Sequence, residues 1–256
     1  MSSVIYGPVS SWRLGRSLGI DLLSTRGNTC SFDCTYCQLG KTVRPLSERK
    51  EFITLTALAK ELETAKGVPA DYATFSGVGE PTLASNLGKA IEIVKSTLGL
   101  PVAVLTNSSF MPREDVRREL ALADVVVAKV DAPDEERFQA INRPFGGYTL
   151  GEILQGIRRF RSEYKGKLAL QMMFVEANRD CAPEMARIAR ELSPDEVQVN
   201  TPLRPCAVKP LPPEEIANIR HKFSGLEGVV TVYEVVTPDV TPLSPDETLR
   251  RRPKAM

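Results

Sequence analysis

Three cysteines lie close together near the start of the chain, in the segment Cys30-Ser-Phe-Asp-Cys34-Thr-Tyr-Cys37. Short runs of cysteine at this spacing are typical of metal sites, because one loop can place several thiolates around a compact metal core. The chain has five cysteines, and the other two are far away in sequence. Three ligands without a nearby fourth cysteine favour a four-iron cluster in which one iron stays open to a reactive ligand.

A zinc site is the alternative interpretation of the same cysteines. Its fourth ligand would be Cys181, Cys206 or the single histidine, His221. Zinc sites usually combine one short cysteine pair with a second pair or with histidines. No second pair follows in this sequence, so the spacing favours the iron–sulfur cluster over zinc.

A second segment with chemical potential is Phe75-Ser-Gly77-Val-Gly79-Glu80-Pro-Thr82, directly after a strand-like apolar run. Glycines allow the backbone to approach a ligand closely, and Glu80 adds a carboxylate at the end of the strand. This pattern predicts a contact of Gly77, Gly79 and Glu80 with a bound molecule. An ordinary glycine-rich turn between a strand and a helix is the alternative.

Polar residues also follow three other strand-like runs, at Asn107, Asp131 and Asn200. Side chains of this kind recognise the hydroxyl, amino and carboxylate groups of small ligands. Capping of turns or of the following helices is the alternative role for Asn107 and Asp131. Lys129 precedes Asp131, but a strand side chain can point to either face of its sheet.

Strand-like and helix-like segments alternate along the chain. The strand-like runs are apolar and rich in β-branched residues, as parallel strands buried on both faces are. They span residues 18–23, 72–75, 102–105, 125–130, 168–175 and 197–199. The amphipathic segments between them carry helix signals: stops at Gly67 and Gly99, a first-turn proline at Pro112, and a capping box from Thr149 to Glu152.

Six strand–helix alternations imply right-handed crossovers and a parallel sheet. They are too few for an eight-unit barrel, so the sequence predicts an α/β fold with an open partial (β/α)6 barrel. In parallel barrels the reactive residues gather at the carboxyl ends of the strands, and the cysteine segment follows the first strand. We expect one domain over residues 1–256, with a core at about 17–201 and a C-terminal extension, 202–256, packed on it. Within this extension, 229–236 is expected to add a strand at the open edge.

The composition indicates a globular enzyme of a reducing compartment. Hydrophobic residues make up 42% of the chain and charged residues 25%, so extensive disorder is not expected. The sequence contains neither a long apolar run nor a signal-peptide pattern, which predicts no membrane span and no secretion. The odd number of cysteines argues against a disulfide framework and for a cytoplasmic location.

The pattern Cys-x3-Cys-x-aromatic-Cys, with Tyr36 in the aromatic position, resembles the radical S-adenosylmethionine (radical SAM) superfamily. The resemblance implies that Cys30, Cys34 and Cys37 hold a [4Fe-4S] cluster, and it implies the same partial barrel. The open iron would bind the amino and carboxylate groups of S-adenosylmethionine, and Gly79 and Glu80 would contact its amino group. Tyr36, Asn107, Asp131 and Asn200 complete the expected cofactor site. A flavodoxin or ferredoxin would supply the electron that generates a 5′-deoxyadenosyl radical.

Four further segments resemble radical enzymes related to wyosine-type tRNA-modifying synthases: 12–21, 38–40, 130–133 and 200–205. This branch makes a tRNA base the candidate substrate. Arg158, Arg159 and the basic tail Arg250–Arg252 with Lys254 would contact phosphates. The chain departs from the branch because it has no cysteine before Cys30 for a second cluster. The competing interpretation is a non-catalytic metal-binding protein that binds nucleic acid or regulates another protein.

Overall fold

The computed structural model describes residues 3–254, and its centre is an eight-stranded sheet in the order β1-β2-β5-β6-β7-β8-β9-β10. The strands are β1 Ile5–Ser11, β2 Gly15–Ile20, β5 Tyr72–Phe75, β6 Val102–Thr106, β7 Val125–Lys129, β8 Lys167–Met173, β9 Glu196–Asn200 and β10 Val229–Thr231. Neighbours pair in parallel except β1, which is antiparallel to β2. The predicted α/β partial barrel is therefore confirmed, with one strand added at each edge.

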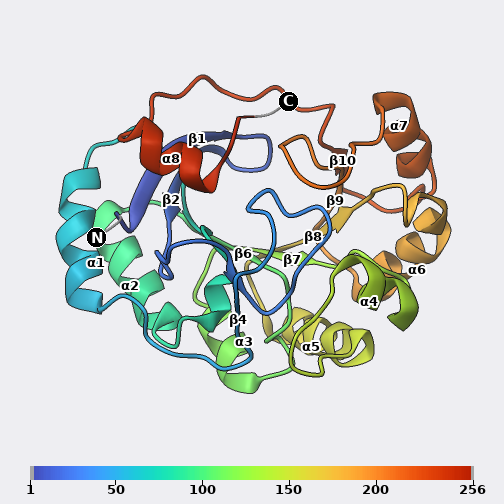
Figure 1. The fold of residues 1–256 in the computed structure, drawn as a ribbon, viewed down its shortest axis with the longest axis horizontal. Coiled ribbons are helices and arrows are strands. Elements are labelled where there is room, and N and C mark those ends of the chain that lie inside the picture. The colour runs from blue at the N-terminus through green and yellow to red at the C-terminus, as the bar shows by residue number, and fades with distance from the viewer. Residues whose placement is uncertain (1–2, 255–256) are drawn as a thin grey trace.

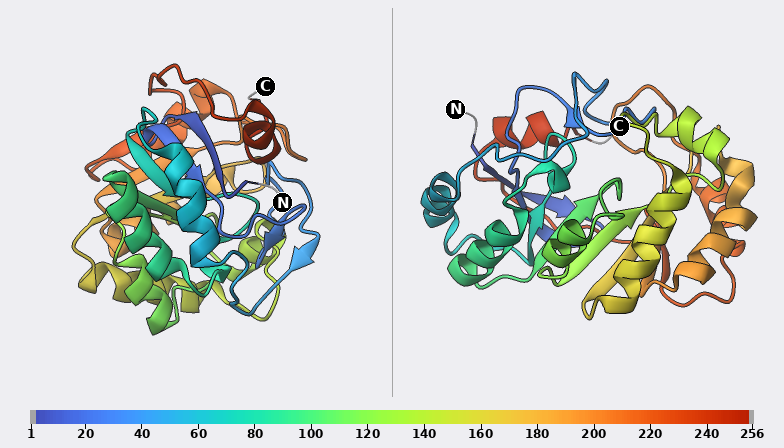
Figure 2. Two further views of the ribbon diagram at one scale, coloured as in Figure 1. Left: turned by 90° about the vertical axis from the view of Figure 1, so that its left-hand side faces the viewer. Right: turned by 90° about the horizontal axis from the view of Figure 1, so that it is seen from below.

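Most of the helices follow the strands and lie around the outside of the curved sheet (Figure 1). They are α1 Leu55–Leu62, α2 Leu87–Leu98, α3 Glu114–Leu120, α4 Glu135–Ile141, α5 Leu150–Glu163, α6 Ala182–Leu192, α7 Pro213–His221 and α8 Pro245–Arg251. Short 3-10 helices occupy Glu63–Ala65, Pro81–Leu83 and Arg179–Cys181. Figure 2 shows the segment after β2 and helix α8 on the side of the sheet away from α2, α3 and α5.

The alternation of side chains along each strand explains these two sides. Val104 and Val126 belong to the large apolar core that the helices cover, whereas their neighbours Ala103 and Val127 belong to a smaller cluster. Leu14, from the turn between β1 and β2, fills this smaller cluster. The turn therefore folds onto the inner face of the sheet.

Several local predictions are confirmed. Gly99 ends α2 in the left-handed conformation, with φ +64°, and the capping box from Thr149 to Glu152 begins α5. Two boundaries were wrong. Pro112 lies before α3, because the N–H of Arg113 donates to Phe110 in a preceding turn.

The second wrong boundary is that of the last strand. The predicted strand at 229–236 is only β10, Val229–Thr231. Its partner β9 ends at Asn200, and the N–H of Val232 makes the last contact, to the carbonyl of Val199. No further backbone of β9 is left to pair with the rest of the segment.

The C-terminal segment packs against β1. The backbone N–H of Gly7 donates to Thr248 Oγ1 at 3.0 Å, and the N–H of Leu243 donates to the carbonyl of Gly7. Arg251 is fully buried, which contradicts a free basic tail at this position. Among residues 3–254, no helix is long and apolar enough to cross a membrane.

Candidate functional site

The cysteine segment lies beyond the carboxyl end of β2 and is held from two sides. Cys30 ends the short strand β3, Thr29–Cys30, which pairs with β4, Arg44–Pro45. The N–H of Thr29 donates to the carbonyl of Val78 at 2.8 Å, in the glycine-rich segment after β5. On the other side, the N–H of Thr35 donates to the carbonyl of Ile141 at 2.9 Å, at the end of α4. The loop is therefore positioned by two units that are distant in sequence.

Each of the three cysteine sulfurs in this loop accepts a hydrogen bond from an asparagine side chain. The pairs are Asn107 with Cys30 at 3.4 Å, Asn142 with Cys34 at 3.5 Å and Asn28 with Cys37 at 3.5 Å. An amide N–H stabilises a sulfur that carries negative charge, as the sulfur of a metal-bound thiolate does. The surroundings of all three thiols therefore favour their metal-bound form.

Burial acts in the opposite direction when no cation is bound. It raises the pKa of Cys34 to about 11, and it raises the pKa of Cys37 and, most strongly, of Cys30, to which the charge of Glu80 adds. Metal ions that replace the thiol protons supply the missing positive charge. The donor set thus suits a strongly cationic core.

The spacing of these donors does not suit a single ion. In the part of the chain that the structure describes, no three His, Cys, Asp or Glu side chains come close enough together to hold one metal ion. Zinc requires four ligands at about 2.0–2.3 Å from one centre. In an iron–sulfur cluster each cysteine binds a different iron, so its sulfurs lie further apart.

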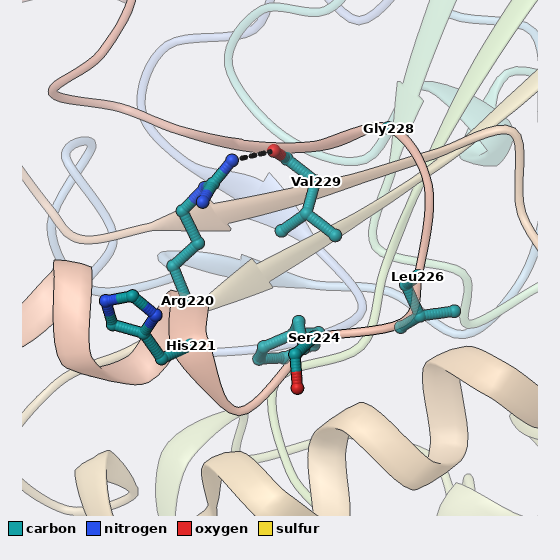
Figure 3. A pocket seen from close by; sticks show the side chains of 7 residues that line it. Arg220, His221, Ser224, Leu226, Gly228 and Val229 are labelled. Atoms are coloured by element: carbon teal, nitrogen blue, oxygen red, sulfur yellow. Dashed lines mark hydrogen bonds between the residues drawn. The ribbon is translucent and has the colours of Figure 1, made fainter.

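The other possible zinc ligands lie in three different surroundings. Cys181 is 5% exposed and belongs to the apolar core. His221 lines a pocket of about 250 Å³ between the end of α7 and β10 (Figure 3). This pocket lies at the β10 edge of the sheet, whereas the cysteine loop follows β2, next to the other edge. Cys206 packs in an apolar cluster with Tyr36 and Cys34, and its thiol donates to the carbonyl of Val208 at 3.1 Å.

The glycines after β5 serve close packing within the protein. A Cβ atom on Gly77 would collide with the carboxylate of Asp21, and one on Gly79 would collide with the carbonyl of Thr29. Packing within the chain therefore requires glycine at both positions, and the ligand contact predicted from the sequence stays a prediction. The contact between Gly79 and Thr29 places the glycine-rich segment directly beside the cysteine loop.

Glu80 is 2% exposed and connects the ends of two strands. Its Oε1 accepts hydrogen bonds from the N–H of Thr82 at 3.0 Å, from the hydroxyl of Thr82 at 2.6 Å and from the hydroxyl of Thr106 at 2.7 Å. Its Oε2 accepts from the N–H of Asn107 at 2.6 Å. Burial raises the pKa of Glu80, and these hydrogen bonds counteract that rise. Glu80 and Asn107 thus form one buried unit beside Cys30.

A second buried unit surrounds Tyr36. Its hydroxyl donates to Asp131 Oδ2, which also accepts from Asn142 Nδ2 at 2.9 Å. The ammonium of Lys129 donates to the Tyr36 hydroxyl at 2.9 Å and lies 4.3 Å from the centre of the ring. Burial and the negative charge of Asp131 raise the pKa of Tyr36 well above its usual value, so the phenol remains a donor. The other carboxylate oxygen of Asp131 accepts from the N–H of Met173 at 2.9 Å.

Asn200 is the predicted site residue with the least contact to the others. It ends β9 and is 5% exposed, and its side-chain oxygen accepts from the N–H of Thr201 at 2.9 Å. Sequence reasoning missed Asn28 and Asn142, which donate to cysteine sulfurs, and left the direction of Lys129 open. Isolated asparagines in loops carry no pattern that marks such a role.

A cavity of about 10 Å³ lies between the two buried units, beside the cysteine loop. Its lining residues are Phe32, Asn107, Lys129, Val130, Asp131, Phe138, Asn142, Leu150 and Ile153. The predicted residues at the ends of β6 and β7 therefore face one common space.

Comparison with known proteins agrees with this arrangement. The radical SAM superfamily matches residues 24–198. A UPF0026 protein of Synechocystis sp. is 41% identical over 81% of this chain and 77% of its own length. A UPF0026 protein of Methanocaldococcus jannaschii is 38% identical over 84% of this chain and 68% of its own length.

The fold is also similar to that of solved structures. SuiB of Streptococcus suis bound to S-adenosylmethionine superimposes with a TM-score of 0.62 at 13% identity over 80% of this chain. The chain spans about half of SuiB, 48% of its length, so the likeness concerns the fold. The chain therefore belongs to the radical SAM superfamily, whose enzymes use a [4Fe-4S] cluster and S-adenosylmethionine, and to its UPF0026 members.

Proposed function

We propose that Cys30, Cys34 and Cys37 are the ligands of the [4Fe-4S] cluster in this enzyme. The observation that carries the proposal is the pairing of each sulfur with an asparagine amide on one loop beyond β2. Three amide donors around three thiolates reduce the cost of holding a negatively charged cluster in a buried place. Protein thiols without a metal do not need such donors.

The S-adenosylmethionine site in this proposal comprises two glycines and five polar residues that end or follow the strands or belong to the cysteine loop. They are Tyr36, Gly77, Gly79, Glu80, Asn107, Asp131 and Asn200. Glu80 would attract the ammonium of the methionine part, because a buried carboxylate with a fixed position suits a cation. Asp131 would accept from hydroxyl groups of the ribose, and Tyr36 would border the adenosyl part.

When bound, the reduced cluster supplies the electron that cleaves S-adenosylmethionine to a 5′-deoxyadenosyl radical. The protein's own contribution is to orient the cofactor and to keep water away from it. Because burial and the charge of Asp131 raise the pKa of Tyr36, its phenol keeps its proton and donates to Asp131. Lys129 balances the charge of Asp131, to which its ammonium lies at 3.8 Å.

We propose hydrogen abstraction from a tRNA base as the reaction of this radical, on the resemblance to the wyosine-type branch. Exposed Arg159 on α5 remains available for a phosphate, whereas Arg158 lies 3.5 Å from Glu191 and Arg161 pairs with Asp195 at 2.9 Å. A flavodoxin or ferredoxin in the cytoplasm would be the electron donor. We further propose that 202–256 forms an extension of one domain, with the core at about 17–201.

The experiment that tests this function is anaerobic reconstitution with iron and sulfide, followed by incubation with dithionite and S-adenosylmethionine. We expect about four irons per chain and formation of 5′-deoxyadenosine, detected by chromatography. Cys30→Ala should lose both, whereas Cys181→Ala, in the apolar core, should retain the iron. Stoichiometric zinc without iron after reconstitution would overturn the proposal.

Two further measurements separate the parts of the proposal. Glu80→Ala should weaken S-adenosylmethionine binding while the iron content remains, and unchanged affinity would remove Glu80 from the site. A gel-shift titration with bulk tRNA should show binding that falls steeply between low and moderate salt, because neutralised phosphates release counterions. No binding at low salt would exclude tRNA as the substrate.

A further inference from the structure

Three arginines lie within range of one another's charges and form no salt bridge among residues 3–254. Arg13 lies in the turn between β1 and β2, Arg204 follows β9, and Arg252 follows α8. All three are partly buried. The charge of Glu196, at the start of β9, acts on Arg13 from beyond salt-bridge distance. Partly buried cations without a counter-charge are costly and need a reason.

Arg204 and Arg252 are brought together by the end of the chain. The guanidinium of Arg204 donates to the carbonyl of Pro253, the residue next to Arg252. Arg252 Nη2 donates to the hydroxyl of Ser76 at 3.0 Å, at the carboxyl end of β5. The carbonyl of Arg251, the residue before Arg252, accepts from Gln38 Nε2 at 2.7 Å, so this end of the chain lies beside the cysteine loop.

Arg13, in the turn on the inner face of the sheet, lies within range of the charges of Arg204 and Arg252. Its guanidinium carbon lies 4.9 Å from the centre of the Trp12 ring, and its Nε is buried without a hydrogen-bond partner. Desolvation and the charges of Arg252 and Arg204 lower the pKa of Arg13 to about 9, although the charge of Glu196 acts in the opposite direction. A guanidinium has five donor hydrogens, and a buried donor without an acceptor destabilises the protein that carries it. An anion would relieve both the missing acceptor and the repulsion.

The group is held in place before any ligand binds. Arg251, next to Arg252, is fully buried and donates to Asp21 Oδ2 at 2.7 Å. Its backbone carbonyl accepts from Gln38 Nε2 at 2.7 Å, one residue after Cys37. These contacts fix the end of α8 against both β2 and the cysteine loop. A pre-organised site loses little entropy when it binds its ligand.

We propose that Arg13, Arg204 and Arg252 bind a phosphate ester group of the substrate beside the proposed cluster. A phosphate group carries up to two negative charges and several acceptor oxygens, which match three guanidinium groups better than a single carboxylate does. This inference assigns a substrate class, a phosphate ester, to the proposed radical reaction, and it therefore rests on the proposed function. The phosphate belongs either to a small phosphorylated compound or to the backbone of a tRNA.

The test is a binding titration of the anaerobically reconstituted full chain, with glycerol 3-phosphate by calorimetry and bulk tRNA by gel shift, at constant ionic strength. Arg13→Gln, Arg204→Gln and Arg252→Gln should each weaken binding roughly tenfold or more, the effect of one lost charge-assisted hydrogen bond. Arg13→Lys should retain part of the affinity because it keeps the charge. The matched control is Arg118→Gln, which removes one charge from exposed α3, outside the group.

The outcome identifies the source of the phosphate. If the three variants lose affinity for glycerol 3-phosphate, the substrate is a small phosphorylated compound. If they lose affinity for tRNA alone, the substrate is a nucleic acid. The inference is overturned if neither probe binds, if the three variants bind like the wild type, or if Arg118→Gln loses as much affinity as they do. Iron content and 5′-deoxyadenosine formed without substrate are measured on the same samples. Absent iron or absent 5′-deoxyadenosine in the wild type would refute the proposed function alone, because phosphate binding is recorded separately.

Discussion

The buried ion pair between Asp21 and Arg251 should be essential for the stability of the chain. The two side chains are 1% and 0% exposed, and they join residues at opposite ends of the sequence. Arg251 also donates to the carbonyl of Ser3 at 2.5 Å and to Glu247 Oε2 at 2.5 Å. Arg251→Met keeps much of the side-chain volume and removes all of these bonds.

The expected cost follows from what the substitution leaves behind. Removing one partner of a buried pair costs about 3–5 kcal/mol, because the other charge remains buried. Asp21 Oδ1 still accepts from the N–H groups of Leu23 and Ser24, at 3.2 Å and 3.0 Å, and Glu247 is partly exposed to water. We therefore expect the lower end, about 3 kcal/mol, or a decrease of roughly 6–12 °C in the melting temperature of a chain of this size.

The assay is anaerobic urea and thermal unfolding of the wild type, Arg251→Met, Asp21→Asn and the double variant, followed by circular dichroism. The double variant should lose less than the sum of the single variants, by about 1–3 kcal/mol. Arg250→Met is the control, since Arg250 lies on the same helix with a partly exposed partner 3.3 Å away, and it should change stability by about 0.5 kcal/mol or less. Equal losses for Arg251→Met and Arg250→Met would refute this reasoning.

Three further outcomes are expected. Asn107→Ala removes a hydrogen bond to a cysteine sulfur. This loss should lower the midpoint potential of the cluster by on the order of 40 mV, which corresponds to about 1 kcal/mol for one electron. An unchanged potential in a redox titration monitored by EPR would contradict a hydrogen bond from Asn107 to the cluster. Gly79→Ala should destabilise the chain by about 1–3 kcal/mol through collision with the backbone, whereas Gly151→Ala, with open space around it on α5, should be neutral or stabilising in the same melting assay. Burial raises the pKa of Glu80, so the folded protein binds the carboxyl proton more tightly than the unfolded chain does. The stability of the wild type should therefore fall relative to that of Glu80→Gln as pH rises from about 4.3. A constant difference between their melting temperatures from pH 4 to 7 would contradict the raised pKa.

Local properties of the sequence were sufficient to predict the six parallel strands and the cysteine loop. Strands buried on both faces require continuous apolar runs. The run Val125–Lys129, between two helical segments, can be recognised in the sequence without knowledge of any tertiary contact. The cysteine spacing is likewise local, because one loop supplies all three sulfurs. The capping box of Thr149 was predictable since both of its partners lie within one helical turn.

The edges of the sheet were less accessible from the sequence. The antiparallel strand β1 and the early end of β10 depend on which neighbour offers free backbone groups. The burial of Arg251 depends on Asp21, 230 positions away. The local sequence around Arg251 therefore predicted only a basic tail. Long-range pairing of this kind leaves no periodic trace in either segment.

The site shows the same division. The sequence by itself determined which thiols and which carboxylate come to the carboxyl ends of the strands, because strand order and loop position follow from local patterns. Only the tertiary structure decided that Asn107 and Asn142 donate to cysteine sulfurs and that Gly79 packs against Thr29. These contacts join separate segments at distances of a few ångströms. The directions of side chains at such junctions are set by the packing of the whole barrel, and no single segment encodes them.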